Sequence, residues 1–308
     1  MARLGFPRSI MEFQERFATE EACRAYLVAS RWPQGFVCRA CGGGEAGERH
    51  RRRLVWQCKA CGHQTSLTAG TVLHGTHTPL RTWFWAAYLV ATHHPGISAK
   101  QLQRQLGLSR YETAWLILHK LRRAMVAPER EPLHGEVEVD ECWIGGVEPG
   151  RIARAPGRKT LVAVAVEVRR AGSGRLRLAP VRDASGPTLQ QFVYDAIAPG
   201  AIVHTDGWTS YNKIAAHGYE HRPRSQRAPR PDGEDPILRR AHCAISNLKL
   251  WLAGTHRGVS REHLPVYLDE YVFRHNRRTT PMAAFQTLLG LGALHGPSTY
   301  AQITRRAV

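Results

Sequence analysis

Two pairs of cysteines spaced as Cys-x-x-Cys constrain this chain more than any other feature of its sequence. The pairs are Cys38/Cys41 and Cys58/Cys61, with the 16 residues 42–57 between them. That spacing is typical of a four-thiolate zinc site in a reducing compartment, with a pair of redox motifs as the alternative. So short a segment cannot bury enough apolar surface to fold alone, whereas binding zinc can contribute ~10–16 kcal/mol. We therefore predict a zinc ribbon whose zinc is structural, because four cysteines leave no open coordination position.

The overall charge limits the kind of partner. Among 308 residues, Lys and Arg number 43 and Asp and Glu number 25, so the formal net charge is +18. Such an excess favours a polyanionic partner, and a hydrophobic content of 43% is enough for packed cores. No apolar run approaches the ~18 residues that cross a bilayer, and residues 1–9 lack the apolar stretch of a signal peptide. We therefore expect a soluble, cytoplasmic, nucleic-acid-binding protein with no membrane partner.

A second DNA-binding element is predicted after the ribbon. A short helix over residues 99–106, a turn at Gly107 and a longer helix over residues 110–125 form the helix-turn-helix pattern. The longer helix is expected to expose Arg110 and Lys120 to DNA. An ordinary helical hairpin, whose exposed charges serve only solubility, is the alternative.

Basic residues elsewhere are candidate phosphate contacts. Arg51 belongs to a basic run, residues 49–53, that lies on or beside the predicted ribbon. Arg277 belongs to a second run at the end of a helix predicted over residues 261–274. For any single arginine in the first run, a solvated loop that merely carries charge is an equal alternative.

From about residue 134 the pattern changes to strands. Strands are predicted near residues 136–140, 161–168 and 175–181, followed by a helix over 188–197 and a short strand that ends at Asp206. The order β-β-β-α-β-α, with Asp140 in the first strand and Asp206 ending the fourth, is the plan of an RNase H-like domain. The predicted fold class is therefore α/β, with an N-terminal helix and zinc ribbon, a helix-turn-helix, and an RNase H-like mixed sheet flanked by helices. The predicted domains are 1–75, 76–128 and 129–289, followed by a tail, 290–308.

The positions of Asp140 and Asp206 suggest a metal site. A carboxylate in a core strand is desolvated, and two such groups brought together repel. A divalent cation removes both penalties, and Mg²⁺ prefers oxygen ligands. Two such ions can clamp the attacking and leaving oxygens of a phosphoryl transfer. If only one of the two Asp residues lay in a core strand, a salt bridge to a nearby Arg would be the simpler interpretation.

Several segments carry a more specific signal. They are residues 69–71 (AGT), 79–84 (PLRTWF), 138–146 (EVDECWIGG), 204–208 (HTDGW), 247–256 (NLKLWLAGTH) and 267–278 (YLDEYVFRHNRR). Together with the four-cysteine ribbon, and in this order, they resemble the ISXO-type insertion-sequence transposases over roughly residues 10–285.

The resemblance implies a DDE-class DNA transposase that uses Mg²⁺ or Mn²⁺. Its first two acids map onto Asp140 and Asp206. The third position maps onto Asn247, 41 residues after Asp206, or onto Glu270, 64 residues after it, and Lys249 becomes a possible DNA contact.

The same resemblance implies partners. The DNA would be terminal inverted repeats and target DNA, bound at the nucleoid. A homo-oligomer would be needed to hold two DNA ends. The alternatives are a non-catalytic zinc-ribbon and helix-turn-helix regulator with a degenerate nuclease domain, and an RNase H-like nuclease that cuts without joining.

Overall fold

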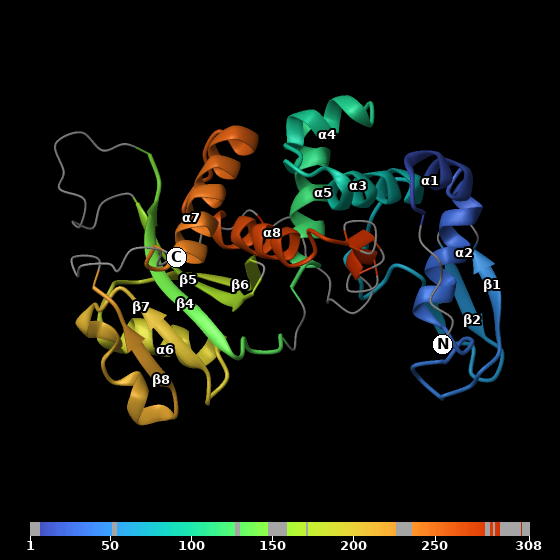
Figure 1. Cartoon of the computed structure of the whole chain (residues 1–308). Helices are drawn as coiled ribbons and strands as arrows, with labels where there is room; N and C mark the ends of the chain where they lie inside the picture. The colour runs from blue at the N-terminus through green and yellow to red at the C-terminus, as the bar shows by residue number, and fades with distance from the viewer. Residues whose placement is uncertain are drawn as a thin grey trace. The chain divides into compact units, whose positions relative to one another are not determined.

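The computed structural model divides the chain into two compact units. It describes residues 7–50, 54–126, 130–146, 159–170, 172–225, 236–280, 284–285, 287–289 and 303 (Figure 1). One unit comprises Met1–Ala127 with Arg277–Val308, and the other comprises Pro128–Asn276. The second unit thus ends at residue 276 rather than at the predicted 289.

The first unit combines five helices with a small sheet. The helices are α1 (Ile10–Arg16), α2 (Glu20–Arg31), α3 (Leu80–Thr92), α4 (Ala99–Gln105) and α5 (Tyr111–Arg123). The strands are β1 (Ala46–His50), β2 (Val55–Cys58) and β3 (Gln64–Ser66), paired antiparallel in the order β1-β2-β3.

An aromatic cluster forms the core beneath these helices. Phe13 stacks on Tyr88 with 4.2 Å between ring centroids, and Phe17 lies 4.9 Å from Phe84. Phe285 packs on Phe13 at 5.6 Å, edge to face. Offset and edge-to-face aromatic pairs contribute beyond the area that they bury. The contacts of Phe285 explain why residues after 276 group with the first unit.

The N-terminal helix predicted before the ribbon is two helices. Thr19 lies between them and caps α2 by accepting a hydrogen bond from the Ala22 N–H at 3.2 Å. The glycine-rich stretch between the cysteine motifs ends in a strand, since Ala46 and Gly47 pair with Cys58 and Gln57 of β2. A strand is formed by hydrogen bonds to a partner strand and needs no large side chain, so glycine residues do not exclude a strand here.

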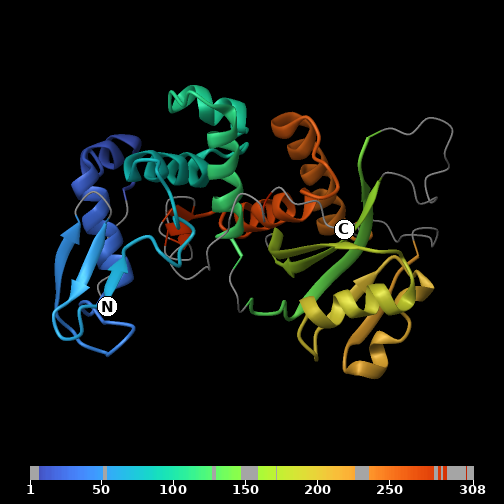
Figure 2. The same ribbon diagram turned by 180° about the vertical axis from the view of Figure 1, so that it is seen from behind.

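The second unit is built on a five-stranded mixed sheet. Its strands are β4 (Glu136–Ile144), β5 (Thr160–Arg169), β6 (Gly172–Val181), β7 (Ile202–Thr205) and β8 (Glu220–Pro223), in the order β6-β5-β4-β7-β8 (Figure 2). Strand β4 pairs antiparallel with β5 and parallel with β7. The strand plan predicted for an RNase H-like domain is therefore confirmed, with β4 at the centre of the sheet.

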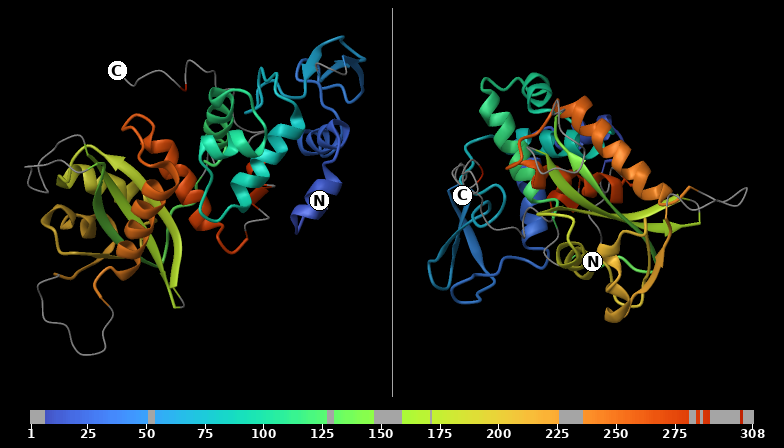
Figure 3. Two further views of the ribbon diagram at one scale, coloured as in Figure 1. Left: turned by 90° about the horizontal axis from the view of Figure 1, so that it is seen from above. Right: turned by 90° about the vertical axis from the view of Figure 1, so that its left-hand side faces the viewer.

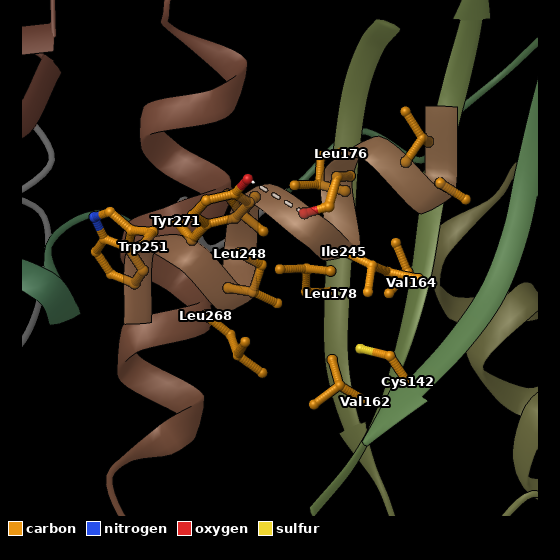
Figure 4. Close-up of a cluster of buried hydrophobic side chains, with 14 of the residues drawn as sticks. Cys142, Val162, Val164, Leu176, Leu178, Ile245, Leu248, Trp251, Leu268 and Tyr271 are labelled. Carbon is orange, nitrogen blue, oxygen red and sulfur yellow. Dashed lines mark hydrogen bonds between the residues drawn. The ribbon is translucent and has the colours of Figure 1, made fainter. Parts of the chain in front are cut away.

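Helices cover both faces of this sheet. They are α6 (Gly186–Ala196), α7 (Arg239–Trp251) and α8 (Leu264–Asn276), with short 3-10 turns at Thr209–Tyr211 and Ile214–His217 and a π-helical turn at Leu252–His256. One buried cluster joins the sheet to α7 and α8, and the other joins it to α6 (Figure 3). In Figure 4, Leu248 and Tyr271 from the two helices meet Leu176 and Leu178 of β6. Alternate residues of β4 therefore face different helices.

The region between β7 and α7 adds an element that the sequence did not predict. It contains the edge strand β8, and α7 begins at Arg239. Strand β8 was not predicted because its four residues, EHRP, lack the apolar alternation of a half-buried strand; they pair in parallel with β7 at one edge of the sheet.

A buried carboxylate from β4 caps α7. Leu238, the residue before the helix, supplies no side-chain hydrogen bond. Instead Glu138, which is 5% exposed, accepts hydrogen bonds from the Arg240 and Ala241 N–H groups at 2.7 and 2.9 Å. It also accepts one from the Arg240 guanidinium at 3.1 Å. A negative charge at a helix N-terminus is stabilising, so Glu138 fixes the start of α7 to the centre of the sheet.

Replacing Glu138 with Ala is expected to lower the free energy of unfolding by ~3 kcal/mol, because two helix N–H groups and a guanidinium lose their acceptor. Urea unfolding measures this change. The control is Glu136→Ala, on the same strand, because Glu136 is exposed and pairs only with His204 across 3.1 Å. A surface pair of this kind is worth ~1 kcal/mol or less. Equal losses in the two variants would contradict the capping role.

Candidate functional site

The four cysteines of the ribbon converge on one point. Their sulfur atoms all lie within 4.8 Å of one another. Two of these separations, 3.6 Å each, join Cys38 to Cys61 and Cys41 to Cys58, so each links one Cys-x-x-Cys motif to the other. Sulfurs at ~2.3 Å from a tetrahedral zinc ion lie ~3.8 Å apart, which the observed spacing fits.

Both cysteine motifs turn in the same way. The Gly42 N–H donates to the Cys38 carbonyl at 2.9 Å, and the Gly62 N–H donates to the Cys58 carbonyl at 3.0 Å. These glycines have φ of +75° and +72°, a backbone conformation that other residues rarely adopt. The turns aim backbone N–H groups at sulfur, and the Cys41 N–H lowers the pKa of Cys38 to about 6, whereas that of Cys41 is raised to about 12: the Gly43 N–H lowers it, but the neighbouring sulfurs of Cys61, Cys58 and Cys38 raise it more. The convergence of the four sulfurs, rather than any one pKa, makes them a structural zinc site.

The second site lies where β4 and β7 run side by side. Their parallel register pairs Glu136 with Ile202 and Glu138 with His204. Continued by two residues, that register sets Asp140 beside Asp206, on the same face of the sheet. Adjacent strands lie ~4.8 Å apart, so the two carboxylates, 66 positions apart in sequence, become neighbours.

The surroundings of Asp140 disfavour its charge. Its side chain is 13% exposed, and burial, followed by the negative charge of Asp206, raises its pKa. The Glu141 N–H, at 2.8 Å from Oδ1, and His242, whose Nε2 lies 3.2 Å from Oδ2, act in the opposite direction. A buried carboxylate beside a second carboxylate is the arrangement that a bound cation would stabilise.

Asp206 sits at a sharp turn after β7. Its Oδ1 accepts a hydrogen bond from the Trp208 N–H at 2.9 Å, and Gly207 between them has φ of +84°. Any other residue at position 207 would be strained in this conformation. The turn therefore holds the carboxylate at the end of the strand, next to Asp140.

A third acidic side chain approaches from the opposite face of β4. The fully buried hydroxyl of Tyr211 donates a 2.8 Å hydrogen bond to Glu141 Oε2. Burial and the charge of Glu141 raise the pKa of Tyr211 well above its usual value, and Asp140 and Asp206 add to that shift. Sequence reasoning did not assign Glu141 or His242 to the site. Glu141 directly follows Asp140 and could have been considered, whereas nothing in the sequence singles out His242.

Two known domain families match parts of this chain. Residues 132–276 match the ISXO2-like transposase domain, and residues 18–64 match the transposase zinc-ribbon domain. The chain belongs to the ISXO2-like transposases. The resemblance drawn from the ordered sequence segments is thereby confirmed, and the two matched domains contain the carboxylate pair and the four cysteines, respectively. No curated protein matches this transposase.

Solved structures of the Mos1 transposase are also similar to this transposase. The crystal structure of the Mos1 strand transfer complex is 16% identical and covers 68% of this chain and 78% of that chain, with a TM-score of 0.23. The Mos1 paired-end complex with the left transposon end has the same identity and coverage and a TM-score of 0.25. TM-scores this low do not define a shared overall fold, so the family rests on the domain matches.

The structure separates the two residues predicted for the third catalytic position. Asn247 is exposed on α7. Glu270 is 1% exposed on α8, where its Oε1 accepts a hydrogen bond from Arg274 Nε at 2.8 Å, and α8 packs against β6. His242, by contrast, touches Asp140. Both assignments stay predictions.

The predicted DNA contacts of this transposase also differ in their surroundings. Arg110 and Lys249 are exposed, and Arg277 is half-buried directly after α8. Arg51 lies outside the described residues. The exposure predicted for Lys120 is wrong, because its ammonium donates to the His74 carbonyl at 3.1 Å and lies 5.9 Å from the centre of the Trp83 ring.

Burial lowers the pKa of Lys120. Helical periodicity places Lys120 on the packed face of α5, where its side chain contacts His74 and Trp83. In the part of the chain that the structure describes, no helix is both long and apolar enough to cross a bilayer.

Cys41→Ser is expected to reduce bound zinc from about one ion per chain to near zero, because three thiolates leave the tetrahedral site incomplete. Metal analysis of the purified chain measures the zinc, and circular dichroism reports the accompanying loss of ribbon structure. Cys243→Ser is the matched control, since Cys243 is exposed on α7 and is not in the four-cysteine cluster. Equal zinc in both variants would contradict the assignment.

Proposed function

We propose that this chain is an active insertion-sequence transposase that binds terminal inverted repeats and cleaves and joins DNA strands with Mg²⁺ or Mn²⁺. The observation that carries the proposal is the pair of carboxylates, Asp140 and Asp206, on adjacent parallel strands of an RNase H-like sheet. The family match supports the same chemistry.

Asp140 and Asp206 would hold the divalent cations. Such ions lower the pKa of bound water and stabilise the negative charge that develops on the leaving oxygen. The protein's part is to keep the two carboxylates close despite their repulsion, through the backbone N–H groups of Glu141 and Trp208. These hydrogen bonds fix the carboxylate oxygens before DNA binds, so little reorganisation is needed during the reaction.

The geometry favours direct phosphoryl transfer over a covalent protein–DNA intermediate. The Tyr211 hydroxyl lies near the carboxylates, yet it is fully buried and donates to Glu141. Attack by Tyr211 would require its ionisation, which burial and three neighbouring carboxylates oppose. We assign Tyr211 to orienting Glu141, with water or a DNA 3′-OH as the nucleophile.

DNA binding is proposed for the ribbon and for the pair α4 and α5. The net charge of +18 suits a phosphate backbone, and Arg110 lies exposed directly before α5. Lys249 and Arg277 are proposed as further phosphate contacts. Two element ends must be held together for joining, so a homo-oligomer on DNA at the nucleoid is part of the proposal.

Asp140→Asn and Asp206→Asn are each expected to abolish metal-dependent cleavage and strand transfer on element-end DNA, because an amide cannot replace a carboxylate ligand's charge. Binding to the same DNA in Ca²⁺ should persist. Asp195→Asn, an exposed acid on α6 that accepts a hydrogen bond from Gln191, is the control and should cleave normally. Cleavage retained after both active-site changes would refute the proposal and favour a DNA-binding regulator. Cleavage by the wild type without joined products would indicate a nuclease.

Arg110→Ala is expected to weaken binding to element-end DNA and to reduce the slope of log affinity against log salt by ~1, because one phosphate contact is lost. Fluorescence anisotropy over a salt series measures the slope. Lys120→Met, which retains the buried aliphatic stem, should leave the slope unchanged. If Lys120→Met reduced the salt slope and Arg110→Ala did not, the start of α5 would not face DNA.

A further inference from the structure

We infer that His242, in the first turn of α7, is the third metal ligand of the site formed by Asp140 and Asp206. The inference rests on the proposed function and adds a nitrogen donor to it. His242 Nε2 lies 3.2 Å from Asp140 Oδ2, and the imidazole is 45% exposed, so it borders the site without being sealed from it. Two ligand atoms at ~2.1 Å on neighbouring octahedral positions lie ~3 Å apart, which the separation of His242 from Asp140 fits. The ligand atoms of Asp140, Asp206 and His242 do not all lie within 4.8 Å of one another, so an ion held by all three would draw the Asp206 carboxylate inward.

The cap formed by Glu138 explains why His242 lies there. Glu138 binds the N–H groups of Arg240 and Ala241, and two residues further along β4, Asp140 meets His242. The first turn of α7 is thus held against β4 at both Glu138 and Asp140. His242 is therefore positioned by backbone contacts at the centre of the sheet rather than by a loop.

Helical periodicity separates His242 from Asn247. Residues seven apart lie almost two turns apart and share a flank of a helix, so Asn247 lies on the flank of Arg240. Arg240 reaches away from β7, donating to the carbonyls of Gly172 and Arg169 in the β5–β6 hairpin at 3.1 and 3.3 Å. Asn247 therefore lies on the flank toward β6, whereas Asp206 follows β7.

The same periodicity brings Lys249 to the flank of His242, seven residues on. A cation on this flank suits a phosphate that approaches the metal site. The flank of α7 that faces Asp140 thus carries one metal-binding and one phosphate-binding side chain.

An imidazole ligand changes the expected metal preference. Mg²⁺ strongly prefers oxygen donors, whereas Mn²⁺ and the later divalent ions accept imidazole readily. A site of two carboxylates and one imidazole should therefore favour Mn²⁺ over Mg²⁺ more than a site with three oxygen ligands. Replacing His242 with Glu should shift the preference toward Mg²⁺.

The test uses the full, zinc-loaded chain without DNA, titrated with Mn²⁺ and observed by electron paramagnetic resonance. The wild type should show a ¹⁴N hyperfine coupling from a directly bound imidazole. H242A should lack that coupling and bind Mn²⁺ at least about tenfold more weakly, since even outer-shell partners of metal ligands cost about this much when lost. H242E should bind Mn²⁺ but show no ¹⁴N coupling. H217A, which removes an exposed imidazole hydrogen-bonded to Tyr194, should behave as the wild type.

Three outcomes would overturn the inference, and they are distinguishable. If D140N loses the Mn²⁺ while H242A keeps the wild-type affinity and spectrum, His242 is not a ligand and the proposed function stands. If D140N binds Mn²⁺ as the wild type does, both the inference and the proposed metal site fail. A loss of affinity in H242A without any ¹⁴N coupling in the wild type would assign His242 to orienting Asp140, which also overturns direct ligation.

Discussion

The parallel pairing of β4 with β7 is the constraint on which the candidate active site depends. It brings Asp140 and Asp206 to the same level on neighbouring strands, where the charge of Asp206 raises the pKa of Asp140. Folding the sheet therefore requires two like charges to approach in a partly desolvated place. Such an arrangement weakens the metal-free protein and strengthens the binding of a cation, because the ion removes the repulsion.

Strand β4 organises the rest of the second unit around that pair. Its even-numbered residues face α7: Glu138 caps the helix, Asp140 meets His242, and Cys142 packs in the buried cluster of Figure 4. Its odd-numbered residues face α6 and the turn that carries Tyr211, where Val137 and Val139 are buried. A single strand thus ties both helical layers to the carboxylates, and a shift of its register by one residue would exchange the two faces.

The two units are stabilised in different ways. The helices α1–α3 enclose an aromatic cluster and need no ion, whereas the ribbon between them has four-, five- and three-residue strands and depends on its four sulfurs. In the second unit, buried carboxylates are fully partnered: Glu138 by the start of α7, and Glu167 by Arg175, which lies 2.7 Å away. These partnered acids stabilise the sheet, whereas neither Asp140 nor Asp206 has a Lys or Arg partner among the described residues, and Asp140 contacts His242.

The sequence by itself determined the zinc ribbon and the chain order of β4, β5, β6, α6 and β7, and it predicted Asp140 and Asp206 as candidate metal ligands. These follow from spacing and periodicity, which are local properties of the chain. Only the tertiary structure decided which face of each helix meets the site. Lys120 is buried because it packs against His74, which is distant in sequence. His242 touches Asp140 because α7 packs against β4, which is also distant in sequence. The flank of α7 that faces the carboxylates depends on where Glu138 anchors the helix, 102 residues earlier in the chain, and no local pattern contains that information.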